Sequence, residues 1–267
     1  MTRVLHISDP HFGTEQPPVV EALVALAHAL SPDVIVMSGD ITQRARRAEF
    51  EAARRFVERL PAVPRAVLPG NHDIPLFNLF GRLFDPYGGF RRAFGTVLEP
   101  VVELPTLLVL GVNTTRFWRH IDGEVSAAQV ARVAGRLRAA DAAQWRLVVT
   151  HQPLHVPDRR DEHNLLHGHG RAIGAWAQAG ADIVMGGHIH LPYVRPLHER
   201  HHRLGRKVWA VHAGTAVSSR VRGRVPNSVN LLQLDAQACV ERWDYGEGGR
   251  FSCVERTPIA RDHRQDA

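Results

Sequence analysis

The first part of the chain alternates short apolar runs with longer stretches in which apolar residues recur at helical spacing. Strands are predicted at residues 4–8, 33–38 and 65–68, and helices at residues 19–30 and 48–60. An order of strand, helix, strand, helix, strand is typical of parallel βαβ units. Because such crossovers are right-handed, we expect the helices to lie on the faces of a parallel sheet.

The same alternation continues after an aromatic interruption. Residues 76–100 are rich in aromatic residues and glycine, so we expect a loop with short helical pieces. Such a segment is either a cap that faces a lipid or a nucleobase, or an ordinary satellite hydrophobic cluster. Further strands are predicted at residues 107–113, 146–150 and 183–185, and helices at residues 126–140, with Ser126 as N-cap, and 171–179.

The pattern changes after residue 193. Strands separated by turn residues are predicted at residues 208–212, 229–234, 239–243 and 251–255. We expect them to form an antiparallel section that completes a second sheet. No internal repeat or low-complexity linker interrupts the 267 residues. We therefore predict one domain over residues 1–256, followed by a frayed polar tail over residues 257–267.

The charge balance favours acidic partners or substrates. The formal net charge is +6 and the isoelectric point is near 10.2. The positive residues are scattered, without a basic helix or interleaved aromatics, so no specific nucleic-acid binding is expected. No apolar run reaches the roughly 18 residues of a membrane span, and the N-terminus lacks the apolar core of a secretory signal. We expect a cytoplasmic protein, with peripheral membrane contact left open and the oligomeric state undetermined.

Cysteine and histidine are the residue types with metal chemistry to assign. Cys239 and Cys253 lack metal-ligand spacing and flank a predicted turn at residues 246–249, so we expect reduced strand residues. The chain has 17 histidines, and His6 lies inside a predicted strand as a packed core residue. Two groups lack carboxylate partners and strand-end placement and are expected in solvated loops: His163, His167 and His169, and His198, His201 and His202.

Other polar side chains follow the predicted strands at the point where each strand ends. They are Asp9 and His11 in SDPH, Asp40 in SGD, Asn71 and His72 in GNHD, His151 in THQP, and His188 and His190 in GGHIH. In an open α/β sheet the carboxyl ends of parallel strands lie along one edge, where ligands bind. Residues that are far apart in the sequence should therefore converge.

The chemistry of this set is that of a metal centre. Asp, Asn and His are oxygen and nitrogen donors suited to Mn, Fe or Zn, and there are more of them than one tetrahedral ion needs. Two ions about 3.5–4 Å apart would need a bridging carboxylate, and Asp40 lies between the two ligand groups in the sequence. Pro10 should bias Asp9 to an extended backbone, so that Asp9 and His11 point to one side with period two. The same geometry is expected for His188 and His190.

The spacing of small residues fits close approach of these turns. Glycines at positions 39, 70, 186 and 187 precede the candidate ligands and leave room for tight turns. The ordered set D-x-H, G-D, G-N-H-D, H and G-H-x-H resembles the signature of calcineurin-like metallophosphoesterases, and it extends from Asp9 to His190, about two thirds of the chain.

The resemblance implies an α/β fold, a four-layer αββα sandwich of two mixed β-sheets flanked by helices, with a dinuclear metal centre. Transferred position by position, it implies one divalent ion at Asp9, His11 and His190 and a second at Asn71, His151 and His188, with Asp40 as the bridge. It also implies that His72 contacts the phosphate or the leaving group and that Asp73 orients it. From the sequence alone, Asp73 is equally well explained as a helix N-cap.

Within the family, the chain resembles bacterial cyclic nucleotide phosphodiesterases. The resemblance implies hydrolysis of phosphodiesters by attack of a metal-bridging hydroxide, with cyclic nucleotides as the first substrate class. The chain is also similar to UDP-diacylglucosamine pyrophosphatases of lipid A synthesis, which usually lack histidine at the position of His72. A pyrophosphate hydrolase of that type, or a non-enzymatic metal-binding scaffold of the same fold, is therefore kept as an alternative.

Substrate contacts are expected from two loops that follow strands. Residues 214–228 carry Arg220 and Arg222, either of which can recognise a phosphate, although a basic surface turn explains them as well. Residues 113–118 (NTTRFW) contribute Asn113 as a further candidate for contact with a small phosphate-ester substrate.

Overall fold

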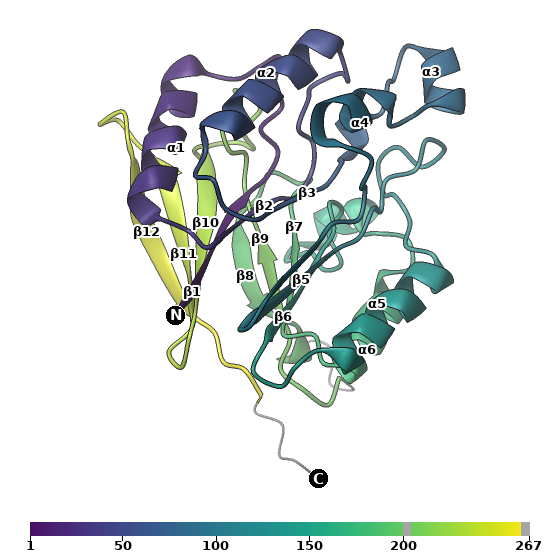
Figure 1. The fold of residues 1–267 in the computed structure, drawn as a ribbon, viewed down its shortest axis with the longest axis vertical. Helices are drawn as coiled ribbons and strands as arrows, with labels where there is room; N and C mark the ends of the chain where they lie inside the picture. Colours follow the sequence, from purple (N-terminus) through teal and green to yellow (C-terminus); the bar gives the residue numbers. More distant parts are fainter. Residues whose placement is uncertain (200–203, 263–267) are drawn as a thin grey trace.

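The computed structural model describes residues 1–199 and 204–262, which form two β-sheets that pack face to face between helices (Figure 1). The first sheet has the strand order β12-β11-β10-β1-β2-β3, and the second has the order β4-β5-β6-β7-β9-β8. Strands β1, β2 and β3 are parallel, as are β5, β6, β7 and β9. The predicted βαβ units of the first sheet are therefore confirmed.

The strand bounds follow the predicted apolar runs, except that β4 and β8 were not predicted. The first sheet contains β1 (Thr2–Ile7), β2 (Val34–Met37), β3 (Arg65–Val67), β10 (Ser228–Leu234), β11 (Cys239–Tyr245) and β12 (Phe251–Pro258). The second contains β4 (Val101–Leu104), β5 (Leu107–Gly111), β6 (Trp145–Val149), β7 (Ile183–Gly186), β8 (Tyr193–Pro196) and β9 (Trp209–His212).

Four longer helices cover the two outer sheet faces. They are α1 (Pro17–Leu30) and α2 (Arg47–Arg59) on the first sheet, and α5 (Ala127–Ala139) and α6 (His169–Ala179) on the second (Figure 1). Ser126 caps α5 as predicted, because its hydroxyl accepts a hydrogen bond from the backbone N–H of Gln129. The aromatic segment holds two short helices, α3 (Leu79–Phe84) and α4 (Gly88–Phe94). Three 3₁₀ turns complete the set: η1 (Asn71–Asp73), η2 (Arg159–Asn164) and η3 (Leu197–Glu199).

Three apolar layers hold this arrangement together. In β1, Leu5 and Ile7 pack with α1 and α2. Val4 points the other way, into the layer between the two sheets, which also contains Leu147 of β6. A third layer, which includes Trp176, lies between the second sheet and α5 and α6. The central strands are thus buried on both faces, which is why they appear in the sequence as continuous apolar runs. The four-layer αββα sandwich implied by the resemblance is confirmed.

The predicted placement of the last strands is wrong. Strand β9 joins the second sheet parallel to β7, and β10, β11 and β12 extend the first sheet antiparallel from the free edge of β1. An apolar run shows that a segment is a strand, but which sheet edge it pairs with depends on the packing of segments more than 200 residues earlier.

The C-terminal boundary also differs from the prediction. Strand β12 continues to Pro258, past residue 256, and Ile259 is buried between the sheets. Arg261 then lies 3.4 Å from the carboxylate of the buried Asp182. An apolar side chain and an ion pair therefore fix the chain beyond the point where the tail was predicted to begin. Residues 263–267 lie outside the described residues.

Two further observations concern the cysteines and the helices. Cys239 and Cys253 are unpaired strand residues on β11 and β12, as predicted, and burial raises the pKa of both thiols. Among the residues that the structure describes, no helix is both long and apolar enough to cross a bilayer.

Sharp backbone turns follow the strands that carry the candidate ligands. Five of these residues have left-handed backbone angles: Asp9 (φ 50°), His11 (φ 42°), Asp40 (φ 49°), His188 (φ 72°) and His190 (φ 55°). The predicted extended backbone with period two at Asp9–His11 and at His188–His190 is therefore wrong. Asp and His tolerate this conformation better than most residues, but each instance is strained and needs support from its surroundings.

Glycine makes the close approach of these turns feasible. A β-carbon on Gly70 would lie 2.0 Å from the backbone nitrogen of Asp40 and 2.2 Å from its Oδ1 atom. A β-carbon on Gly187 would lie 1.9 Å from Ser8 Oγ and 2.2 Å from Asp9 Oδ2. No side chain can be accommodated at either position without moving a candidate ligand, so the predicted role of these glycines is confirmed.

We predict that Gly70→Ala lowers the free energy of unfolding by about 3 kcal/mol, the upper range for overpacking a tight interior. The added methyl group meets backbone rather than a flexible side chain. The matched control is Gly135→Ala in α5, where no atom lies within 4 Å of the added carbon. That change should raise stability by about 0.5–1 kcal/mol, because it favours the helix. Urea unfolding of both variants gives the comparison, and equal stabilities would contradict the packing argument.

Candidate metal centre

The candidate ligands converge at the edge where the parallel strands of both sheets end. The first sheet contributes Asp9, His11, Asp40 and Asn71, and the second contributes His151, His188 and His190. Three groups have ligand atoms within 4.8 Å of one another: Asp9, His11 and His190; His11, Asp40 and His72; and Asp40, His151 and His188. The centre thus lies across the junction of the two sheets.

Asp40 lies between the two ligand groups. Its Oδ2 atom is 3.7 Å from His11 Nε2, and its Oδ1 atom is 3.2 Å from His151 Nε2. On the side of His11, the Nε2 atoms of His11 and His190 are 3.1 Å apart. On the other side, His151 Nε2 lies 3.0 Å from Asn71 Oδ1. One carboxylate with an oxygen toward each group has the geometry that a bridging ligand needs.

The surrounding carbonyl groups select the ring nitrogen that faces the centre. His151 Nδ1 donates to the carbonyl oxygen of Ser38 at 2.8 Å, and His190 Nδ1 donates to that of Arg220 at 2.6 Å. In each ring Nε2 is therefore the nitrogen that faces the cluster, and it is the atom that would bind a metal ion once its proton is lost. Both ring nitrogens of His188 are buried without a hydrogen-bond partner among the described residues. Such a buried polar group needs a partner that protein atoms do not supply.

A chain of hydrogen bonds behind the centre holds Asp9. Ser8 Oγ donates to Asp9 Oδ2 at 2.6 Å, and Ser38 Oγ donates to Ser8 Oγ at 2.8 Å. His6 Nε2 lies 2.9 Å from Ser38 Oγ at the far end of the chain. His6 is a packed core histidine as predicted, and burial lowers its pKa to about 3. Its ring also orients a candidate ligand, which the sequence did not indicate.

The charges of the cluster fit bound cations. Burial alone would raise the pKa of Asp40, but the neighbouring His151 and His72 rings lower it well below its usual value. Burial likewise opposes ionisation of Asp9, yet its contacts with His190 hold its pKa below the ordinary range. Both buried carboxylates are therefore ionised, and buried charges in proteins are paired or coordinate metals.

The imidazoles divide into two kinds. Burial lowers the pKa of His11 and of His188 to about 3, so these rings are neutral and keep a lone pair. Burial also disfavours charge on His151, but the adjacent Asp40 carboxylate outweighs it and raises the pKa of His151 to about 9. His11 and His188 are thus neutral donors, whereas His151 would release its proton when a metal ion binds. Together with the ionised carboxylates they form a donor set that fits Mn, Fe or Zn, and the seven predicted ligands would hold such ions.

His72 is half-buried beside this cluster, and its orienting group differs from the one implied. Its Nδ1 atom donates to the carbonyl oxygen of Gln43 at 2.8 Å. Asp73 does not orient the ring: its carboxylate accepts the backbone N–H groups of Ile41, Thr42 and Gly70 at 2.8–3.0 Å. Asp73 instead joins the Asp40 turn to the Asn71 turn, and burial followed by the nearby Asp40 raises its pKa to about 6.

The two candidate arginines have different surroundings. The Nη1 atom of Arg220 lies 3.2 Å from His72 Nε2 and 3.0 Å from the side-chain oxygen of Gln43. Arg222 instead pairs with the Asp161 carboxylate, through contacts of 3.0 Å at each of its two terminal nitrogens. Arg220 thus borders the centre, whereas the guanidinium of Arg222 is occupied by a local ion pair.

Asn113 is also occupied locally. Its side-chain oxygen accepts hydrogen bonds from the backbone N–H and the hydroxyl of Thr115, which is an Asx turn. The same loop supplies a residue that the sequence analysis missed. His120 lies 6.0 Å from His72 between ring centroids, and its Nδ1 atom is buried without a partner among the described residues. The loop after β5 was singled out only to Trp118, two residues short of His120.

A small cavity connects His72 and His120. It is lined by Gln43, Arg44, His72, Ile74, Leu76, Phe77 and His120. One wall is therefore polar and adjoins the metal residues, and the other wall is apolar. The two groups of histidines expected in solvated loops are distributed as follows: His163 and His167 are exposed, and His169 and His198 are half-buried. His201 and His202 lie outside the described residues.

Comparison with solved structures agrees with the fold described above. A purple acid phosphatase from yellow lupin, Lupinus luteus, superposes with a TM-score of 0.71 at 16% identity, covering 98% of this chain and 54% of that one. A dimetal phosphatase from Danio rerio superposes with a TM-score of 0.68 at 15% identity, covering 98% of this chain and 99% of that one. At these identities the likeness concerns the fold.

Sequence comparison gives the relationship. A Synechococcus protein named "Probable cyclic nucleotide phosphodiesterase" is 29% identical over 126 residues, which span 46% of this chain and 44% of that protein. The family model described as calcineurin-like phosphoesterase matches residues 2–192, a range that holds all seven candidate ligands. This match covers well over half of the chain, which therefore belongs to the calcineurin-like phosphoesterase family.

Proposed function

We propose that this protein is a dinuclear metal-dependent hydrolase of phosphodiesters, with cyclic nucleotides as its first substrate class. The observation that carries the proposal is the convergence of three groups of carboxylates and imidazoles, two of which share Asp40. His72 belongs to one of them, and Arg220 lies beside it. Family membership supports hydrolysis of a phosphoester. The similarity to a protein named as a cyclic nucleotide phosphodiesterase supports the choice of the diester.

The proposed chemistry divides between the ions and the protein groups beside them. When bound, a pair of divalent ions would lower the pKa of a water molecule and neutralise charge on the phosphoryl oxygens. Arg220 adds a fixed positive charge next to His72, suited to a phosphate oxygen. Gln43 fixes the His72 ring through Nδ1, and in this proposal Nε2, beside the Arg220 guanidinium, is the ring nitrogen that faces the phosphate or the leaving oxygen.

The cavity between His72 and His120 favours a diester over a simple monoester. It offers room on the far side of His72 for the organic part of a second ester group, with Ile74, Leu76 and Phe77 as an apolar wall. In this proposal His120 contacts that group through its unpartnered nitrogen. The apolar wall also keeps the pyrophosphate hydrolase of UDP-diacylglucosamine type as a second candidate.

A hydrolysis panel tests the proposal directly. Protein reconstituted with Mn, Fe or Zn is assayed on bis-p-nitrophenyl phosphate, p-nitrophenyl phosphate, cyclic nucleotides and UDP-diacylglucosamine, with chelator-treated protein as the blank. We expect turnover of the diester and of cyclic nucleotides, and none in the blank. Preference for the monoester under every metal would overturn the diester proposal, and no turnover with full metal content would favour the non-enzymatic scaffold.

We predict that Asp40→Asn nearly abolishes turnover and lowers metal content, because the amide supplies one neutral oxygen where the carboxylate supplies two charged ones. Elemental analysis and diester hydrolysis measure the two effects. The control is Asp141→Asn, which makes the same chemical change at an exposed loop residue. Full turnover of Asp40→Asn with two ions bound would exclude the bridging role.

For His72→Ala we predict unchanged metal content and a fall in kcat of about 10²-fold, typical of losing a positioned acid or electrostatic donor. His163→Ala, at an exposed position in η2, serves as the control and should retain full kcat. Loss of metal from His72→Ala would instead identify His72 as a ligand, since its ring lies within reach of His11 and Asp40.

A further inference from the structure

The first part of the aromatic segment exposes large apolar side chains to solvent. In and before α3, Phe77 is 72% exposed, Phe80 is 74% exposed and Phe84 is 68% exposed, and no residue of the helix is buried. The second part behaves differently, because Phe90 of α4 is fully buried against α2 and its neighbours. The satellite-cluster interpretation therefore holds for α4 but not for α3.

The loop after β5 extends this exposed surface. Arg82 of α3 donates a hydrogen bond to the carbonyl oxygen of Phe117, and Tyr87 donates one to that of Thr115. These contacts hold the loop against α3 while Trp118 and Ile121 are also exposed. We call the combined surface the apolar ridge; it consists of Leu76, Phe77, Leu79, Phe80, Leu83, Phe84, Trp118 and Ile121. Few soluble surfaces carry this many neighbouring apolar side chains without a binding role.

Arginines flank the ridge. Arg44 lies over the Phe77 ring, 5.4 Å from its centroid, and Arg46 and Arg92 share a hollow with Leu76 and Phe77. We call Arg44, Arg46, Arg55 and Arg92 the basic flank. In the part of the chain that the structure describes, Arg44, Arg55 and Arg92 have no carboxylate within ion-pair distance.

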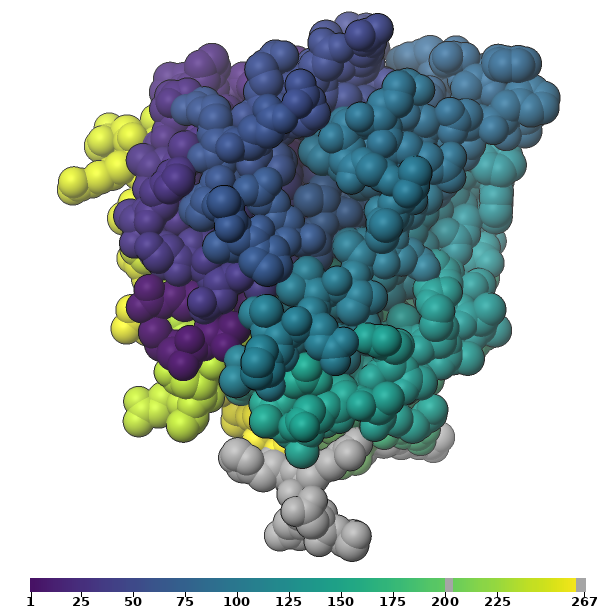
Figure 2. All heavy atoms as spheres, viewed as in Figure 1, coloured from purple at the N-terminus to yellow at the C-terminus, as the bar shows by residue number. Residues whose placement is uncertain are grey.

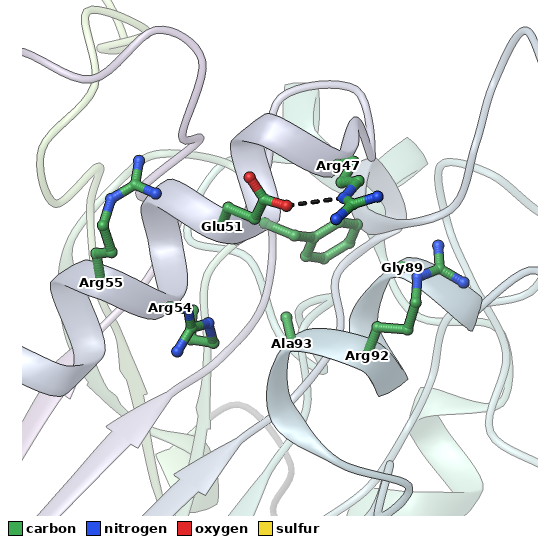
Figure 3. A pocket seen from close by; sticks show the side chains of 8 residues that line it. Arg47, Glu51, Arg54, Arg55, Gly89, Arg92 and Ala93 are labelled. Carbon is green, nitrogen blue, oxygen red and sulfur yellow. Dashed lines mark hydrogen bonds and ion pairs between the residues drawn. The ribbon is translucent and has the colours of Figure 1, made fainter.

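The basic flank continues into a hollow between α2 and α4. Figure 3 shows it lined by Arg47, Arg54, Arg55 and Arg92, with Glu51 as its one carboxylate, paired with Arg47. The hollow measures about 390 Å³, which is room for a phosphate-sized headgroup. Helices α2, α3 and α4 lie together across the upper surface of the molecule in Figure 2, so ridge and flank belong to one side.

This combination selects one kind of partner. Apolar side chains beside unpaired arginines are typical of surfaces that insert into the interface of a bilayer containing anionic lipids. A second copy of this chain carries the same net positive charge of +6, whereas an anionic bilayer supplies the negative charge that the basic flank lacks. A small substrate would be enclosed by a concave site, whereas α3 protrudes with all of its residues at least partly exposed.

We propose that the apolar ridge docks this protein on an anionic lipid bilayer, with the basic flank on the lipid phosphates. Leu76 and Phe77 belong both to the ridge and to the cavity beside His72. Docking therefore places the mouth of that cavity at the lipid surface. Docking would also deliver a membrane-borne phosphoester to His72, and this consequence rests on the proposed function. The docking proposal itself is independent of that function.

Vesicle co-sedimentation of the full chain tests the docking. We expect the protein to pellet with vesicles of equal parts phosphatidylcholine and phosphatidylglycerol, and to pellet less with phosphatidylcholine alone. Phe80→Ser/Phe84→Ser should lower partitioning at least tenfold, because it removes the exposed aromatic pair of α3. The matched control is Val97→Ser/Val254→Ser, which changes two apolar side chains that are 61% and 51% exposed away from the ridge.

A second pair of variants tests the charge. Arg46→Gln/Arg92→Gln should weaken binding to the anionic vesicles several-fold and make binding less sensitive to salt. The control, Arg138→Gln/Arg171→Gln, removes the same charge from exposed positions on α5 and α6 and should bind as the parent protein does. All four substitution pairs alter exposed side chains, and circular dichroism verifies that each variant is folded.

Three results would overturn the docking proposal. They are failure of the parent protein to pellet with anionic vesicles, equal binding of Phe80→Ser/Phe84→Ser and its control, and a dimer in sedimentation velocity that this variant abolishes. The last result would assign the ridge to a second copy of the chain. Hydrolysis of a water-soluble diester is measured on the same samples. Vesicle binding without hydrolysis would reject the proposed function alone, and hydrolysis without vesicle binding would reject the docking alone.

Discussion

The metal centre depends on turns in which the backbone is held in an unfavourable conformation at the ends of buried strands. Positive φ angles occur at five of the candidate ligands: Asp9, His11, Asp40, His188 and His190. Each is a strained conformation that persists only because surrounding contacts stabilise it. The stabilising contacts are polar and connect one turn to another. The carboxylate of Asp73 binds the turn after Asp40 and that of Gly70, and Asp9 accepts the backbone N–H of His188 at 3.0 Å. Loss of one of these contacts would therefore destabilise two turns.

The position of the centre follows from the packing of the two sheets. Four candidate ligands come from the first sheet and three from the second, so neither sheet alone could hold the pair of ions. The apolar layer between the sheets brings the two groups within reach of one another, with Asp40 close to His11 on one side and to His151 on the other. Bound ions would in turn neutralise the buried carboxylates, whose negative charge is unfavourable away from water. Folding of the core and metal binding at the site are therefore coupled.

The sequence by itself predicted the four longer helices, the identity of the candidate donors and most of the strands, although not β4 and β8. Buried strands are continuous apolar runs, and a carboxylate or imidazole directly after such a run has to lie at the sheet edge. Parallel strand order predicts that such residues gather at one edge of a sheet. The assignment of Asp40 and His151, 111 residues apart, to one centre came from the resemblance to the family. The need for glycine next to the candidate ligands was also predicted from the sequence, and the structure shows the reason: only a residue without a side chain fits where Gly70 contacts Asp40. These features depend on local pattern and on rules that hold for all α/β sheets.

Only the tertiary structure decided the rest, because it depends on which segments meet. The carboxylate of Asp73 accepts a backbone N–H from the turn after Asp40, and the His72 ring is oriented instead by the carbonyl oxygen of Gln43. Strand β10 pairs with the edge of β1, and β11 and β12 extend the sheet from β10, whereas no local sequence pattern shows which strand edge is open. Likewise the exposure of α3, the ion pair of Arg222 and the approach of His120 to His72 follow from distant neighbours. Composition names the groups that can react or bind, but their partners are set by contacts between segments far apart in the chain.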